Sequence, residues 1–64
     1  MTSTTRTAAA KILAAATIKH ECAARAAYVA EMRGGRGVGL AKYREAQAWQ
    51  EVCAARAAYE TVAA

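Results

Sequence analysis

The sequence predicts an all-α protein whose chain folds back once into an antiparallel two-helix hairpin. Three observations lead to that fold class. Twenty of the 64 residues are alanine, the residue with the highest helix propensity. Proline, aspartate and asparagine are absent, so residues that break helices or favour turns are scarce. All four glycines fall within residues 34–39, which places a single turn near the middle of the chain.

The local signals divide the chain, as one domain, into four segments. Thr4 or Thr5 can begin a helix, because a threonine hydroxyl accepts a bond from an early backbone N–H. Gly34 or Gly35 suits the left-handed residue that ends many helices. The expected segments are, in order, an N-terminal tail, a first helix, a glycine-rich turn and a second helix, at residues 1–4, about 5–33, 34–39 and about 40–63.

The short turn makes the two helices antiparallel neighbours. Residues whose numbers sum to about 73 should then lie at the same level of the hairpin. The heptapeptide CAARAAY occurs twice, at 22–28 and 53–59. Because Cys22 and Cys53 nearly satisfy that sum, the two copies are expected to lie side by side, one in each helix.

Each expected helix carries a stripe of apolar residues at intervals of three and four, which predicts the contact between the helices. Alanine at many of these positions allows close approach. The stripe of the first helix comprises Ala8, Ile12, Ala15, Ile18, Cys22, Ala26 and Val29. The stripe of the second comprises Ala41, Ala48, Val52, Ala55, Tyr59 and Val62, with Glu45 as the one polar intrusion.

A second apolar row on each helix predicts a further interface. Ala46, Trp49, Cys53 and Ala57 form the row on the second helix, and Leu13 and Ala27 belong to the row on the first, with His20 between them. One hairpin contact covers one row per helix, so a dimer of hairpins, as a four-helix bundle, would cover both. The alternative is that the second row, Trp49 included, stays in water. The predicted protein-interface residues are Leu13, Ile18, Val29, Trp49, Val52 and Tyr59.

The two cysteines, Cys22 and Cys53, allow two interpretations. A disulfide between them would close a loop of about 30 residues and contribute about 3–4 kcal/mol. The preferred interpretation is two small, buried, reduced thiols, because the chain shows no convincing export signal and cytosolic thiols stay reduced.

The sequence predicts no catalytic residue, metal site or cofactor. His20, Glu21 and Cys22 are consecutive, so they project from a helix in three directions and cannot converge on zinc or form a catalytic pair. Glu21 with Arg25, and Arg56 with Glu60, have the spacing of surface ion pairs within one helix. A two-helix chain also offers no pocket large enough to exclude water from a substrate.

The glycine-rich turn is flanked by cations, which gives the alternative function of nucleic-acid or anion contact. The residues are Arg33, Arg36, Lys42 and Arg44. Arginines in a glycine-rich setting resemble segments that bind single-stranded nucleic acid, and the net charge of +4 agrees with an acidic partner. The competing interpretation is a solvated turn.

These features together predict a small non-catalytic protein-interaction module, either a self-assembling subunit or an adaptor or inhibitor of a larger target. No apolar run approaches the roughly 20 residues that span a bilayer, so membrane binding is not expected. The basic, hydroxyl-rich residues 1–20 are interpreted as helix rather than as a targeting segment. Abundant alanine, glycine, valine and arginine suggest a GC-rich genome, and hence the cytoplasm of a bacterium or of a phage-infected cell.

Overall fold

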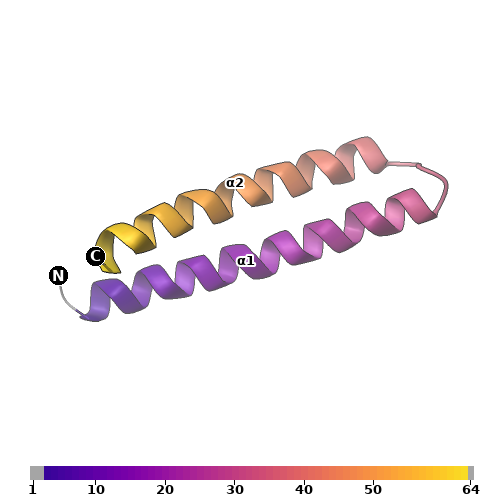
Figure 1. Cartoon of the computed structure of the whole chain (residues 1–64). Helices are drawn as coiled ribbons and strands as arrows, with labels where there is room; N and C mark the ends of the chain where they lie inside the picture. Colours follow the sequence, from indigo (N-terminus) through magenta and orange to yellow (C-terminus); the bar gives the residue numbers. More distant parts are fainter. Residues whose placement is uncertain (1–2, 64) are drawn as a thin grey trace.

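The chain forms two long helices that pack side by side in opposite directions (Figure 1). The computed structural model describes residues 3–63. Helix α1 spans Ser3–Met32 and helix α2 spans Val38–Ala63. The molecule is a rod with Cα extents of 49 × 13 × 12 Å. The all-α hairpin that the sequence predicts is therefore confirmed.

Both helices begin two residues earlier than expected, the first ends one residue earlier, and the second ends where expected. Helix α1 begins at Ser3, so Thr4 and Thr5 lie inside its first turn rather than before it. Helix α2 begins at Val38, so Gly39 is helical and the turn is residues 33–37. Residues 1–2 of the expected tail lie outside the described part of the chain.

Glycine backbone geometry ends helix α1 as predicted. Gly34 and Gly35 have φ angles of 93° and 85°, in the region that residues with a Cβ rarely adopt. The Gly34 N–H donates to the Glu31 carbonyl at 3.2 Å, and the Gly35 N–H donates to the Ala30 carbonyl at 3.1 Å. This pair of bonds is the Schellman motif, which satisfies carbonyls that the helix end leaves without partners. Gly37 then begins helix α2, because its carbonyl accepts the Ala41 N–H at 3.1 Å.

Two glycine-to-alanine substitutions should have opposite effects on stability. At Gly35, alanine meets no atom within 4 Å but must adopt a positive φ, which costs about 1–2 kcal/mol. At Gly39, alanine also meets nothing within 4 Å, and in a helix it is favoured by about 0.5–1 kcal/mol. Urea denaturation followed by circular dichroism should show Gly35→Ala destabilised and Gly39→Ala stabilised. Equal effects of the two would contradict this assignment of the turn.

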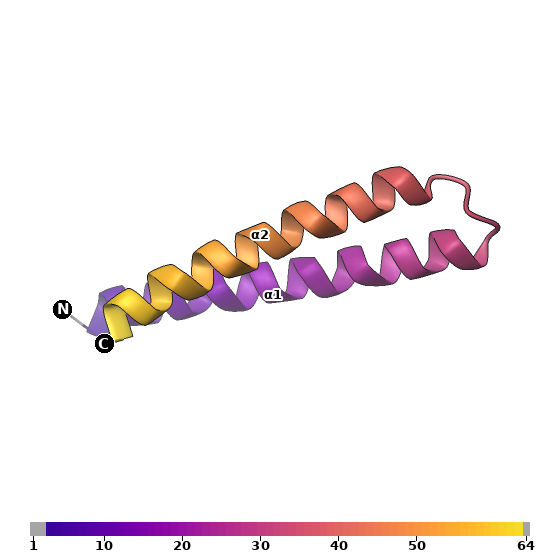
Figure 2. The same ribbon diagram turned by 45° about the horizontal axis from the view of Figure 1, so that its top comes forward.

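The core between the helices is made of small residues. The buried apolar residues are Ala27, Ala48, Val52 and Ala55. Three of them come from the stripe predicted for helix α2, so that face is confirmed. Figure 2 shows the two helices still side by side after rotation of the view. Such alanine-rich contact favours helix axes near the short end of the 8–10 Å range.

The face of helix α1 that contacts α2 is not the one expected. Ile12, Ile18 and Val29 are exposed, and Ile18 keeps 61% of its surface in water. The row at the contact is the second row, in which Leu13 and His20 are half-buried and Ala27 is buried. The physical reason is size. Alanine on α1 makes room for Val52 and Tyr59 on α2, whereas the isoleucine stripe would hold the helices apart.

The repeated heptapeptides are displaced along the rod rather than side by side. Lys19 pairs with Glu51 and Lys42 with Glu31, so the register agrees with the predicted one to within about three residues. At that register residues 22–28 lie beside residues near 45, and residues 53–59 lie beside residues near 14. Each copy therefore packs against a different segment of the opposite helix.

Candidate protein-interaction surface

Trp49 and His20 meet on one side of the hairpin, which we call the tryptophan side. Their ring centroids are 5.2 Å apart with an interplanar angle of 52°. The Arg56 guanidinium carbon lies 5.9 Å from the centroid of the Trp49 ring, within cation–π range. Even with these two neighbours, Trp49 remains 44% exposed. Cys53, one helical turn beyond Trp49, is also exposed and projects on the same side.

An ion pair between the helices lies on the same side, nearer the turn. The Lys42 ammonium is 2.9 Å from a Glu31 carboxylate oxygen. A hydrogen bond from Lys42 to Glu31, together with the charge of Glu31, raises the pKa of Lys42 above 10.5. Lys42 and Glu31 are both well exposed, so the pair is screened by solvent and adds little to stability.

The raised pKa of Lys42 predicts a small stability contribution that depends on pH. Because folding favours the protonated lysine, the contribution is fully present below pH 10.5 and disappears as the pH rises through the folded-state pKa. Lys42→Gln should therefore melt slightly below the parent protein near neutral pH, and the difference should vanish in strong alkali or high salt. Thermal melts of both proteins across that pH range check this. A difference that persists in alkali would contradict it.

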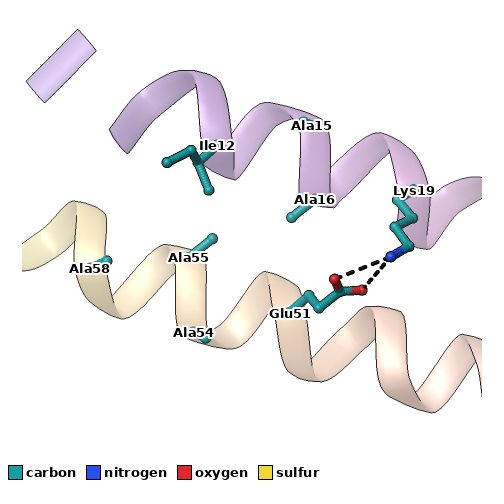
Figure 3. Close-up of a pocket in the computed structure, with 8 residues that line it drawn as sticks. All are labelled: Ile12, Ala15, Ala16, Lys19, Glu51, Ala54, Ala55 and Ala58. Atoms are coloured by element: carbon teal, nitrogen blue, oxygen red, sulfur yellow. Dashed lines mark hydrogen bonds and ion pairs between the residues drawn. The ribbon is translucent and has the colours of Figure 1, made fainter. Parts of the chain in front are cut away.

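The opposite side of the hairpin carries an apolar groove between the two helices (Figure 3). Ile12 and the alanines of both helices line it, and its volume is about 570 Å³. Lys19 and Glu51 close one end, with the ammonium 3.1 and 2.9 Å from the two carboxylate oxygens. The lining residues are Ile12, Ala15, Ala16, Lys19, Glu51, Ala54, Ala55 and Ala58.

The structure divides the six predicted interface residues between the inside and the outside of the hairpin. Val52 is 2% exposed and is part of the core. Leu13 and Tyr59 are half-buried at the contact between the helices. Ile18 and Val29 lie on the outer face of α1, away from α2, and Trp49 lies on the tryptophan side.

Both cysteines are free thiols on the surface. The interpretation of Cys22 and Cys53 as small buried thiols is therefore wrong. Cys22 lies near Ile18 on the part of α1 that faces away from α2, so the exposure of both side chains has the same cause. Cys53 lies beside Trp49, outside the contact. The two thiols consequently point from different helices to different sides of the rod.

The predicted anion contacts do not form one patch. Arg33 and Arg36 are exposed at the turn. Lys42 is on the tryptophan side and is engaged by Glu31. Arg44 is two residues further along α2, on the groove side, where it lies near Lys19 and Glu51. This dispersal weakens the nucleic-acid alternative, which needs cations that track one backbone.

Sequence reasoning missed the interactions that join the helices. The pairs expected within one helix, Glu21 with Arg25 and Arg56 with Glu60, are not formed in the described residues, where the ion pairs cross the hairpin instead. The contact of Trp49 with His20 was missed because it depends on the rotation of α1 about its own axis. The sequence did contain one indication of this contact, because His20 is the polar residue in the otherwise apolar second row of the first helix.

Metal binding, membrane crossing and similarity to known proteins were each tested on this chain. Within residues 3–63, no group of three or more potential metal ligands is placed to hold an ion. Neither α1 nor α2 combines the length and apolar character that a membrane-crossing helix needs. Compared with protein-family models, curated proteins and solved structures, the chain matches none.

Proposed function

We propose that the protein is a non-catalytic protein-interaction module that binds another protein through the apolar side chains that its own fold leaves outside. The observation that carries the proposal is the contrast between core and surface. Among the described residues, three alanines and one valine are buried, whereas the exposed ones include Ile12, Ile18, Met32, Leu40 and Trp49. Burying a side chain of that size is worth about 1.5–3 kcal/mol.

The small core also supplies little stability, which favours a binding partner. A domain below about 70 residues seldom obtains more than 3–5 kcal/mol from one core, and natural domains of this size add a disulfide, a metal or a partner. The two cysteines are free, and the described residues bring no metal-ligand group together. The exposed apolar side chains favour the third of these, in which binding to another chain adds stability. The partner is either a second copy or a larger target.

Sedimentation equilibrium of the purified protein tests the proposal. We expect a mass that rises above 6.7 kDa with increasing concentration, and equally so with and without reductant, because apolar contact rather than a disulfide joins the chains. A species that stays monomeric and fully helical at every concentration would contradict the need for a partner. A dimer that reductant abolishes would show covalent linkage in place of apolar binding.

A further inference from the structure

We infer that the tryptophan side of the hairpin is the docking surface for a second copy of this chain, with the two α2 helices antiparallel across a two-fold axis that crosses the tryptophan side at the level of residue 51. This inference deepens the proposed function and rests on it. The surface is defined by Lys42, Ala46, Trp49, Cys53, Arg56 and Glu60 of α2. Their spacing of alternating four and three residues is that of a stripe that packs against another helix.

The surface area of the hairpin agrees with one copy of this chain as the partner. The chain exposes 4762 Å², whereas a compact monomer of 6.7 kDa exposes about 3,900 Å². The excess of about 850 Å² matches the roughly 800 Å² that each partner buries in an interface of standard size. A dimer that buries this area would leave each chain with the exposed surface of a compact monomer of its own mass.

Self-complementarity fixes the register. In a two-fold interface, residue i contacts residue j and j contacts i. With the axis at the level of residue 51, Trp49 lies opposite Cys53 of the second copy, and Lys42 lies opposite Glu60 of the second copy. The large ring thus faces a small side chain, and Lys42, which already pairs with Glu31 of its own chain, faces the carboxylate of Glu60, twice over. Ala46 lies opposite Arg56, whose aliphatic stem can cover it.

Charge argues against the other exposed apolar stripe as the contact between copies. The outer face of α1 carries Ile18 and Val29, but Lys11, Arg25 and Arg33 are exposed beside them. Glu21 is the one acid near that stripe. This face therefore has a net positive charge. Packing it against the same face of a second copy would bring two positively charged surfaces together, and their repulsion opposes binding.

The two native cysteines provide a matched test, because one lies on the proposed surface and the other on the outer face of α1. In the proposed dimer the two Cys53 Cα atoms are about 11 Å apart, from the helix rise and a typical interhelix distance. The two Cys22 side chains point outwards on opposite sides and lie on the order of 20 Å or more apart. A bis-maleimide with a short spacer reaches the first separation and not the second.

The experiment uses the full chain as Cys22→Ala, which retains Cys53, and as Cys53→Ala, which retains Cys22. Both replaced thiols are exposed, so neither change disturbs the core, and circular dichroism verifies equal helicity. Urea-unfolded samples give the background from random collision. We expect cross-linked dimer well above background for Cys22→Ala, and background alone for Cys53→Ala.

The other outcomes overturn the inference in distinguishable ways. Sedimentation can show dimers while cross-linking occurs through Cys22 alone, through both thiols equally, or through neither. In each of these cases the copies associate through a different face. The inference then fails, whereas the proposed self-association stands. If both variants and the parent sediment as monomers, self-association itself fails, and the inference fails with it.

Discussion

Replacing Ala48 with leucine is expected to remove a large fraction of the stability of the hairpin. Ala48 is 2% exposed at the centre of the contact between α1 and α2. A leucine there pushes the helices apart along a contact that depends on alanine for its closeness, and such overpacking costs about 1–3 kcal/mol, occasionally more. Since a core this small supplies only about 3–5 kcal/mol, the loss is a large fraction of the stability. Helicity and urea denaturation at fixed concentration measure it.

Ala54→Leu is the matched control for that substitution. Ala54 is on the same helix, but it is exposed and lines the groove. The added methyl groups enter the open groove beside Ile12, so we expect unchanged or slightly increased stability. If Ala48→Leu were tolerated as well as Ala54→Leu, the close contact around Ala48 would not describe the protein in solution.

The second large effect is expected from Trp49→Ala, which should weaken self-association by about 30-fold or more. Tryptophan is enriched among interface hot spots, where truncation to alanine costs about 2 kcal/mol or more. In the isolated hairpin Trp49 is only partly covered, by His20 and Arg56. Most of the loss should therefore appear as a higher dissociation constant in sedimentation, and less as a change in the helicity of the hairpin at saturating concentration.

Tyr43→Ala serves as the aromatic control. Tyr43 is more exposed than Trp49, and its hydroxyl accepts a hydrogen bond from Gln47 on its own helix, away from the tryptophan side. Removing it should leave the dissociation constant unchanged. Equal weakening by the two substitutions would mean that general loss of apolar surface, rather than the tryptophan side, governs association.

The sequence predicts the topology well because few alternatives exist. With four glycines gathered in one place and no proline, the chain can turn only there, and Gly34 and Gly35 supply the positive φ angles that the helix end requires. The contact face of α2 was also predicted correctly, since Ala48, Val52 and Ala55 are buried, although the row that carries Trp49 competed with it.

The rotation of α1 could not be predicted because two alanine-rich rows compete on that helix. Ranking the rows by hydrophobicity selects Ile12, Ile18 and Val29, whereas packing selects the smaller row around Leu13 and Ala27. The difference is steric and depends on the partner helix, which periodicity alone does not describe. The exposure of Cys22 and the meeting of His20 with Trp49 follow from that rotation.

Thermal unfolding of the reduced protein over a thousand-fold range of concentration tests most directly whether this hairpin depends on a second chain. Association of two copies adds about 1.4 kcal/mol for each tenfold increase in concentration, so the midpoint should rise by about 10 °C or more across the range. A single cooperative transition at high temperature, with the same midpoint at every concentration, would show that the two helices suffice for each other.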